Sequence, residues 1–329
     1  VLSTTRVVAD HDVASATTRQ LHQKLLGGPT VSTQVAVSTA VDIVKAPLLY
    51  KGKVRELYDL GEHYLIVVTD RISAFDYVLD PPVPNKGNVL NQLSAYWFEL
   101  TESFQPNHVV HTDVTKLGDL VTDPAVLKNR IMVVKKAERI DMECIVRGYI
   151  TGGGWRQYTS TREINGIELP EGIRKNERFS EPLFTPSAKN DVGHDEDISF
   201  AEMEAFIGAE LAGKLRDLSI ELYRYAHDYC EKRNIILADC KFEFGLIDGE
   251  IILIDELFTP DSSRFWAKEN YALDVEIDSM DKEPVRTYLA NSGWDKNSKP
   301  DPLPEHVIEE TSRRYQDIYS RLVADEWSE

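Results

Sequence analysis

The spacing of apolar residues predicts long helices in the first third and at the end of the chain. The first runs through "NVLNQLSAYWFELTES" (88–103), where Leu90, Leu93 and Trp97 recur every three or four residues. The last runs through "EHVIEETSRRYQDIYSRLV" (305–323), whose apolar residues also gather on one face. Both patterns are typical of helices that cover a core with one side and meet water with the other.

A further long helix opens at "SFAEMEAF", where Ser199 and Glu202 have the spacing of a capping box. Its apolar stripe continues to about Asn234, so we expect one unbroken helix. Strands are predicted where β-branched and apolar residues form short runs bounded by turn residues. These runs are "KVRELYD", "HYLIVVTD", "RIMVVKKAERI" and "MECIVRGYI". The glycines of "TGGGW", which follow the last run, indicate a flexible connection.

The order of these elements predicts an α+β fold with two lobes. Residues 1–45 contain no aromatic side chain and are rich in Ser and Thr, which indicates a loosely ordered N-terminal extension with at most a short helix near "TTRQLHQKLL". Residues 46–138 form a strand-rich N-terminal lobe. Residues 139–329 form a C-terminal lobe of strands and long helices, with loops and short strands over 160–198.

Composition narrows the possible functions. The 329 residues include 55 acidic and 37 basic side chains, a net charge of −18, which argues against nucleic acid as a partner because a phosphate backbone requires a basic face. The chain contains no continuous apolar run long enough to span a membrane. Its three cysteines and eight histidines show no metal-binding spacing, so a zinc enzyme is not expected. A reduced, cytoplasmic location is the simplest account of the cysteines.

Charges inside a predicted hairpin are the first sign of a functional site. The segment "ILADCKFEFGLIDGEIILIDELFTPDSSRFW" contains two apolar strands joined by an Asp-Gly turn. Alternation places Asp239, Lys241 and Glu243 on one face of the first strand. A two-residue turn would pair Glu243 with Ile254, whereas a three-residue turn or a bulge would pair it with Asp255.

The hairpin acids predict a magnesium site. Two neighbouring carboxylates repel each other unless a cation lies between them. Mg²⁺ suits such a place because it binds one or two carboxylates and completes its shell with phosphate oxygens and water. The alternative is a solvated face with cross-strand salt bridges, against which the apolar runs of both strands argue. We therefore expect Glu243 and Asp255 to bind the metal.

Other segments supply cations and hydroxyls suited to phosphate. "TPDSSR" holds Ser262, Ser263 and Arg264 in a predicted turn, where Asp261 or Ser262 serving as an ordinary helix cap is the equal alternative. "YKGK" places Gly52 between two lysines, where the backbone can approach a phosphate. Ordinary surface lysines are the alternative for that motif.

Two further motifs carry arginines. "MECIVRGYI" places Arg147 on a strand that looks buried, so it needs an anionic partner, either a structural acid such as Glu143 or a ligand. "TDRISAFD" offers Arg71, Ser73 and Asp76 on a loop after an apolar strand.

Seven ordered motifs together resemble one known family. They are "GKVRELYD", "TDRISAFD", "PNKGNVLNQLSAYWF", "ECIVRGYITGGGW", "LFTPSAK", "DCKFEFG" and "IDELFTPDSSRFW". In this order, over about residues 46–300, they resemble the phosphoribosylaminoimidazole-succinocarboxamide synthases, the SAICAR synthetase family of purine biosynthesis. The resemblance implies a two-lobed fold similar to ATP-grasp and protein-kinase nucleotide sites, with ATP between the lobes.

The resemblance further implies an ATP-dependent carbon–nitrogen ligase that uses ATP and Mg²⁺. ATP activates the carboxylate of an aminoimidazole carboxylate ribotide, and the amine of L-aspartate then attacks to give SAICAR, ADP and phosphate. Such an enzyme works by positioning and charge neutralisation rather than through a covalent side-chain nucleophile. A site made of cations, acids and glycines agrees with that chemistry.

The resemblance also implies a role for each motif residue. The catalytic residues are Lys241, Lys189 and Asp255. The ATP-binding residues are Lys51, Gly52, Lys53, Lys135 and Glu143. The metal ligands are Glu243 and Asp255. The residues that hold the ribotide are Arg71, Ser73, Asp76, Arg147, Ser262, Ser263 and Arg264.

Three parts of the sequence depart from the family pattern. The family usually has Ser where Gly153 stands, so a phosphate-contacting hydroxyl is missing, and backbone N–H groups or Thr151 are the candidates to replace it. Cys240 replaces a common Thr, a change that we expect to be structural. Residues 1–45 lie outside the resemblance, and targeting to a plastid or another organelle is an alternative to the cytoplasm, although the acidic residues of this segment are untypical of a targeting peptide.

Two other functions would use the same features. A small-molecule kinase would share the lobes, the lysines and the magnesium acids, and a catalytically silent module would bind nucleotide without turnover. The expected partners are ATP, the ribotide and L-aspartate, without nucleic acid or membrane. The sequence does not distinguish a monomer from a homo-oligomer.

Overall fold

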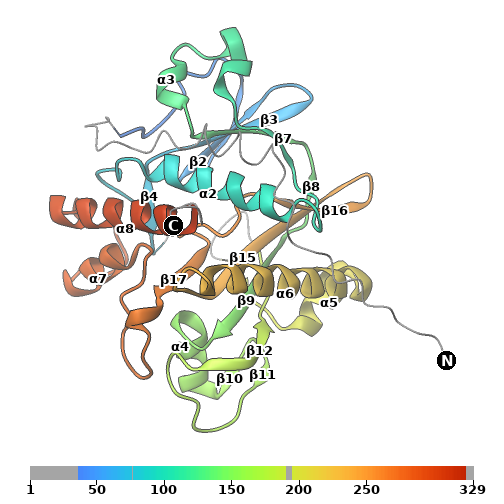
Figure 1. Cartoon of the computed structure of the whole chain (residues 1–329), viewed down its shortest axis with the longest axis vertical. Helices are drawn as coiled ribbons and strands as arrows, with labels where there is room; N and C mark the ends of the chain where they lie inside the picture. The colour runs from blue at the N-terminus through green and yellow to red at the C-terminus, as the bar shows by residue number, and fades with distance from the viewer. Residues whose placement is uncertain (1–35, 76, 190–194, 324–329) are drawn as a thin grey trace. The chain divides into compact units, whose positions relative to one another are not determined.

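The first of two large antiparallel sheets takes its strands from residues 48–135 (Figure 1). The computed structural model describes residues 36–75, 77–189 and 195–323, which all belong to one unit, Ala36–Glu329. In spatial order the strands are β1 (Leu48–Lys51), β2 (Arg55–Asp59), β3 (His63–Val68), β7 (Ile131–Lys135) and β6 (Val109–His111). The strands predicted at "KVRELYD", "HYLIVVTD" and "RIMVVKKAERI" are thus confirmed.

The two faces of this sheet pack against different parts of the chain. On one face, Leu65 of β3 joins an apolar cluster with Ala40 and Val44, which precede the sheet in sequence. On the other face, Val68 of β3 packs against α2 (Lys86–Thr101). The alternation of apolar residues along β3 produces both contacts, because successive side chains point to opposite faces.

The residues just before β1 correct the expected extension. Ala40 is fully buried and Val44 nearly so. The backbone N–H of Ala40 donates a hydrogen bond of 2.8 Å to Oε2 of the buried Glu56. A loosely ordered state is therefore wrong for residues 36–45, because their apolar side chains and backbone donors are used by the fold. Residues 1–35, with the expected short helix, lie outside the described residues.

The second sheet is arranged around β15 (Ile235–Ile247), a strand of 13 residues. Its direct neighbours are β8 (Glu138–Arg139), β9 (Met142–Tyr149), β16 (Glu250–Ile254) and β17 (Ser263–Ala267). The sheet is completed by β12 (Arg178–Phe184), β13 (Ser187–Ala188) and β14 (Glu196–Asp197). Because β15 is long, it pairs with β9 and β17 along its first part and with β16 along its second part.

The hairpin of β15 and β16 has the two-residue turn. Asp248 and Gly249 form it with φ values of 53° and 83°, which a short Asp-Gly turn favours. Glu243 therefore pairs with Ile254, and the alternative that pairs it across the ladder with Asp255 is wrong. Asp255 instead follows the strand, in the left-handed region at φ 70°.

The long helices at 88–103 and 305–323 are confirmed as α2 (Lys86–Thr101) and α8 (Glu305–Val323), which lie side by side (Figure 1). Smaller elements are the hairpins β4 (Ile72–Ala74) with β5 (Tyr77–Leu79) and β10 (Glu163–Ile164) with β11 (Ile167–Glu168), the helices α3 (Pro124–Leu127) and α7 (Glu283–Asn291), and 3-10 turns at Val114–Leu120 and Lys268–Asn270. The first hairpin packs on α7 and α8 through an apolar cluster of its own.

The helix that was expected to run unbroken to Asn234 is divided by Gly208. The capping box at its start is confirmed, because the side chains of Ser199 and Glu202 bond reciprocally to the backbone. The first part is α5 (Phe200–Ile207) and the second is α6 (Ala209–Glu231). Gly208 has φ 87° and ψ 144°, a conformation closed to residues with a Cβ, so one continuous apolar stripe becomes two helices.

The glycine stretch after β9 is also different from the expectation. It begins a helix, α4 (Gly152–Thr161), instead of a flexible connection. Gly152 stands at φ 53°, and a Cβ there would lie 2.7 Å from the guanidinium nitrogens of Arg264. The glycine thus permits a close approach of the helix start to an arginine, which is a requirement for packing and not for flexibility.

One apolar core joins both sheets and the long helices. It includes Val68 of the first sheet, Phe242 of the second, Trp97 of α2, Leu222 of α6 and Ile318 of α8. The first sheet ends with β7 at Lys135 and the second begins with β8 at Glu138, while the apolar packing continues from one sheet to the other, so a lobe boundary at residue 138 stays a prediction. None of the helices in the described ranges combines the length and the apolar content needed to cross a membrane.

Candidate active site

Lys241 is the centre of a group of charged side chains on β15. Its Nζ is 2.6 Å from Oε1 of Glu243 and 3.0 Å from Oε1 of Glu143. Oδ2 of Asp255 lies 3.9 Å from the same nitrogen. The sheet explains the first two contacts, because Lys241 pairs with Ile145 on β9 and side chains two residues apart share a face.

Lys189 adds a second ammonium group to this place. Ser187 of β13 pairs with Glu143, and Lys189, two residues further on, donates a hydrogen bond to Oε2 of Glu243. Burial alone would raise the pKa of the Glu243 carboxyl, but Lys241 and Lys189 together hold that pKa well below its usual range. Glu243 is therefore ionised at neutral pH although it is buried.

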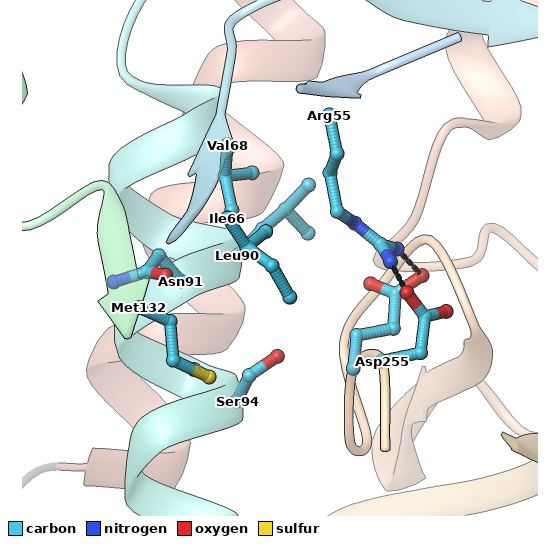
Figure 2. A pocket seen from close by; sticks show the side chains of 9 residues that line it. Arg55, Ile66, Val68, Leu90, Asn91, Ser94, Met132 and Asp255 are labelled. Carbon is cyan, nitrogen blue, oxygen red and sulfur yellow. Dashed lines mark ion pairs between the residues drawn. The ribbon is translucent and has the colours of Figure 1, made fainter. Parts of the chain in front are cut away.

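Arg55, from β2 of the first sheet, faces the acids that follow β16. Its guanidinium forms ion pairs with both Asp255 and Glu256 (Figure 2). These three residues line a pocket together with Ile66, Val68, Leu90, Asn91, Ser94 and Met132, and Figure 2 shows Arg55 and Asp255 on one side of it. The pocket therefore lies between the first sheet, α2 and the end of the hairpin, and the first sheet contributes a cation to it. We use the name lysine group for the three cations and four acids described so far, which are Lys241, Lys189, Arg55, Glu143, Glu243, Asp255 and Glu256.

The carboxylate oxygens of the lysine group could serve as ligands of a magnesium ion. Its four carboxylates and three cations give a net charge of −1. Among the residues that the structure describes, no three Asp, Glu, His or Cys side chains are arranged to hold a metal by themselves. Mg²⁺ needs only one or two protein carboxylates when nucleotide phosphates supply further oxygens. The side chains therefore suit an ion that binds together with a nucleotide.

A second group of charges, which we call the arginine group, consists of Arg147, Asp239 and Arg264. Nη1 of Arg264 donates to Oδ2 of Asp239 at 2.8 Å, and Nη1 of Arg147 lies 3.7 Å from the same oxygen. Asp239 is placed between them because it pairs with Arg147 on β9 and with Arg264 on β17. The acid partner of Arg147 is thus Asp239 and not Glu143. Two guanidinium groups share one carboxylate, so the group attracts an anion.

The start of α4 adjoins the arginine group. A Cβ on Gly152 would meet the guanidinium of Arg264, and a Cβ on Gly154 would lie 3.3 Å from Cδ of Arg147. Glycine at both positions lets the N-terminus of the helix approach the two arginines. Because N–H groups at a helix N-terminus favour anions, they add to the positive potential of the guanidinium groups.

The turn before β17 connects the two groups. Oγ1 of Thr259 donates a hydrogen bond to Oε2 of Glu256 in the lysine group, and Ser262 and Ser263 donate their backbone N–H groups to the carbonyl oxygen of Thr259. Ser263 is buried, and its Oγ has no hydrogen-bond partner among the described residues. The hydroxyl of Ser263, next to Arg264, is therefore a candidate donor to a ligand.

The loop between β1 and β2 contains Gly52 and Lys53, and Arg71 holds it from within the fold. Nη2 of Arg71 donates to the carbonyl oxygen of Gly52 at 2.9 Å, and its Nε donates to that of Lys53 at 3.0 Å. Nη1 of Arg71 is 3.0 Å from Oε1 of the buried Glu56. The side chain of Arg71 is thus bound to the glycine-lysine loop, and its grouping with the ribotide residues stays a prediction.

The other expected residues lie on separate elements. Nζ of Lys51 is 3.6 Å from Oε1 of Glu56, beside the same loop. Lys135 is exposed at the end of β7, and Ser73 is half-buried on β4. Asp76 lies outside the described residues.

Comparison with known proteins decides the family. Residues 48–301 match the family model described as SAICAR synthetase. The chain belongs to the SAICAR synthetase family. Two relatives named phosphoribosylaminoimidazole-succinocarboxamide synthase are similar over most of their length. That of Elusimicrobium minutum (strain Pei191) is 45% identical over 282 residues, 85% of this chain and 97% of the relative. That of Citrifermentans bemidjiense is 48% identical over 277 residues, 84% of this chain and 94% of the relative.

Solved structures of SAICAR synthetases have the same fold. A SAICAR synthase of Saccharomyces cerevisiae, complexed with SAICAR, superposes with a TM-score of 0.78 at 34% identity, over 91% of this chain and 100% of that one. A SAICAR synthetase in complex with ADP superposes with a TM-score of 0.61 at 24% identity, over 84% and 97% of the two chains. The predicted α+β fold and the predicted ATP-dependent ligase that forms SAICAR are confirmed by these comparisons.

The SAICAR synthetase match leaves two described parts of the chain outside. Residues 36–47 precede it, and α8 follows it. Sequence reasoning also gave no role to several side chains that the structure places at or beside the site. In "KVRELYD", Arg55 and the buried Glu56 are neighbours on a strand, so their side chains point to opposite faces. This alternation could have placed Arg55 on the face that meets the charged site. Lys86 in "PNKG" carried no such signal, because a lysine in a Pro/Gly loop is ordinarily exposed.

Proposed function

We propose that the lysine group binds the phosphates of ATP together with Mg²⁺, and that the arginine group binds the phosphate of the ribotide. The observation that carries this proposal is the placement of Lys241 among the carboxylates of Glu143, Glu243 and Asp255. Lysines held between acids are a poor device for stability alone, because burial of each charge costs free energy that a hydrophobic residue would not. They are a good device for a highly charged ligand.

Glu243 and Asp255 would hold the metal, which when bound neutralises phosphate charge. Lys241 and Lys189 keep Glu243 ionised and offer N–H donors to phosphate oxygens. Arg55 offsets part of the negative charge of Asp255 and Glu256 through its two ion pairs. The ribotide carboxylate oxygen then takes the terminal phosphoryl group, and the amine of L-aspartate displaces phosphate from the activated carbon. These side chains act by position and charge, since the chemistry needs no protein nucleophile.

The glycine-lysine loop would lie against the nucleotide phosphates. Arg71 draws the carbonyl oxygens of Gly52 and Lys53 toward itself, so these acceptors are kept from a phosphate that they would repel. Glu56 in turn holds Arg71. The arrangement supports a role for Arg71 in shaping the ATP loop.

The ribotide phosphate would be held by Arg147, Arg264 and the start of α4. The family usually has Ser at the position of Gly153. The surroundings of this glycine support another donor in place of the missing hydroxyl. The atom nearest to a Cβ placed on Gly153 is Nη2 of Arg156, at 3.7 Å. The guanidinium of Arg156 thus stands next to the place of the missing hydroxyl and offers a donor with a positive charge, in addition to the N–H groups of the helix.

A coupled assay of ADP release tests the proposed function. ADP should form at a high rate only when the aminoimidazole carboxylate ribotide, L-aspartate and MgATP are all present, and amide product should equal ADP. Phosphorylated ribotide that accumulates without L-aspartate would indicate the kinase instead. ATP binding without turnover, at saturating substrates, would indicate the silent module. A monomer or homo-oligomer in the cytoplasm, without nucleic acid or membrane as partners, stays a prediction.

A further inference from the structure

A buried carboxylate outside both charged groups joins three elements of the fold. Asp261 lies in the turn before β17, Lys86 is the first residue of α2, and Tyr315 lies midway along α8. Nζ of Lys86 is 2.6 Å from Oδ2 of Asp261, and the hydroxyl of Tyr315 donates to Oδ1 at 2.6 Å. Lys86 and Tyr315 are fully buried. Lys282, whose Nζ is 3.9 Å from Oδ1, is the fourth member.

The carboxylate of Asp261 is stabilised by the other members of the cluster. Burial would raise the pKa of Asp261, but the ammonium groups of Lys86 and Lys282 and the two short hydrogen bonds hold that pKa well below its usual range. Burial, followed by Asp261, raises the pKa of the Tyr315 hydroxyl, which therefore remains a donor. Nζ of Lys86 also lies 5.6 Å from the centre of the Tyr315 ring. Asp261 is thus fixed from opposite sides by a helix start and a helix middle.

The place of Asp261 in the chain gives the cluster its consequence. The turn from Thr259 to Ser263 lies in the chain between Glu256 of the lysine group and Arg264 of the arginine group. It therefore connects the two groups. Within it, the backbone N–H of Asp261 donates to Oγ1 of Thr259 at 3.2 Å. A shift of the Asp261 side chain therefore moves the segment that carries Ser263 and Arg264.

Part of this support comes from α8, which follows the residues that the family model matches. The family match ends at residue 301, and α8 begins at Glu305. α8 also bonds to the region before α2, since Oγ of Ser312 donates to the carbonyl oxygen of Pro84 at 2.9 Å. Helix α8 thus bonds to the turn through the hydroxyl of Tyr315 and to Pro84, close to Lys86 in the chain, through the hydroxyl of Ser312.

We propose that Tyr315 and Lys86 are positioning residues for the ribotide site. They fix Asp261, and through it the turn that presents Ser263 and Arg264 to the ribotide phosphate. The inference rests on the proposed function of the arginine group. It assigns to the C-terminal helix a share in substrate affinity, which a helix that only covers the core would not have.

The test compares two tyrosines of α8 that make the same kind of bond in different places. Tyr315→Phe removes the hydroxyl on Asp261. Tyr319→Phe removes a hydroxyl that donates at 2.8 Å to Oε1 of Gln92, away from the turn. Both variants lose one hydrogen bond, so both should unfold at somewhat lower temperature. Only Tyr315→Phe should raise the KM for the ribotide, about fivefold to tenfold, with kcat and the KM for ATP within twofold of wild type.

Two further variants distinguish a failure of the positioning role from a failure of the proposed function of the arginine group. Lys282→Gln weakens the same cluster from its half-exposed edge and should raise the ribotide KM about twofold, which keeps the test available if Tyr315→Phe folds poorly. Arg264→Ala should raise the ribotide KM far more than either. If Arg264→Ala does so while the Tyr315 and Lys282 variants match Tyr319→Phe, the positioning role is refuted and the arginine group stands. If Arg264→Ala changes only the KM for ATP, the proposed function of the arginine group is itself refuted.

Discussion

At the scale of single residues, the site is a problem of buried charge. An isolated ammonium group or carboxylate inside a protein costs several kcal/mol, and this cost is offset only when partners surround it. Lys241 has such partners in Glu143 and Glu243, and Glu243 has a second one in Lys189. The pKa of Lys241 is lowered by burial but raised more strongly by these acids, so its ammonium group stays charged. The site thus keeps its charges before any ligand arrives.

Asp255→Asn should separate chemistry from folding. Asn keeps the size of the side chain and tolerates the positive φ of 70° at this position, so the backbone is preserved. The loss of one negative charge weakens the proposed metal site, and kcat should fall by roughly a hundredfold, equivalent to about 2.7 kcal/mol. Steady-state kinetics at several Mg²⁺ concentrations, together with a thermal unfolding curve, would measure both effects.

Asp248→Asn is the matched control for that experiment. It makes the same substitution at the other end of β16, also at positive φ, on an exposed turn. Its kcat and its response to Mg²⁺ should equal those of wild type. An Asp255→Asn enzyme that kept full activity would rule out the metal role of Asp255.

Which residues sequence reasoning could place depended on how far apart their partners lie in the chain. Lys241 and Glu243 share a strand, so alternation alone puts them on one face. The partners of Arg71 were beyond reach, because its bonds to the loop at Gly52 and Lys53 depend on how β2, β3 and the chain before β1 fold together. The contact of Lys86 with Asp261 joins residues 175 positions apart, and no local pattern encodes it.

At the scale of elements, apolar periodicity predicted where helices lie but not where they stop. The pattern for α8 gave its observed limits, since both ends coincide with the amphipathic stretch. The break at Gly208 was missed because the apolar stripe continues across it into α6. The start of α4 at Gly152 was missed for a related reason: glycines usually end helices, and only the neighbouring Arg264 explains why they begin this one.

Substitution of two glycines by alanine should have opposite effects on stability. Gly208 has φ 87°, and no atom lies within 4 Å of the place that a Cβ would take, so Gly208→Ala strains the backbone without a clash. The free energy of unfolding should fall by roughly 1–3 kcal/mol. Gly213 lies inside α6 with equally open space, and Gly213→Ala should raise it by about 0.5–1 kcal/mol, because alanine loses less entropy in a helix.

Urea unfolding of both alanine variants, each compared with wild type, measures these changes. Similar effects of the two substitutions would mean that the junction of α5 and α6 can straighten into one helix, as the sequence pattern alone predicts. In that case the division at Gly208 would not be a strained feature of the backbone.

At the scale of the whole described unit, one core and several buried polar groups must fold together. His108 is such a group: its ring packs against Phe98 at 5.4 Å between centres, and its Nε2 has no hydrogen-bond partner among the described residues. Burial, with the nearby charges of Arg55 and Lys135, lowers the pKa of His108 to about 3. The imidazole is therefore neutral in the folded protein at every pH at which the enzyme would work.

This histidine should make stability depend on pH. In the unfolded chain His108 binds a proton as the pH falls below about 6.5, while in the folded protein it does so only near pH 3. The unfolded state thus binds more protons between these values, so stability that is present above pH 6.5 is lost as the pH falls. Between pH 7 and pH 5 this one group should lower the free energy of unfolding by about 2 kcal/mol.

His108→Phe removes that proton and keeps an aromatic ring against Phe98. Urea unfolding at pH 7, 6 and 5 should therefore show a loss about 2 kcal/mol smaller in the variant than in wild type across this range. His306→Gln, which removes an exposed histidine of α8, should follow the wild-type curve. Parallel curves for His108→Phe and wild type would show that a proton enters the buried site without unfolding it, and the core beside the lysine group would then be open to water.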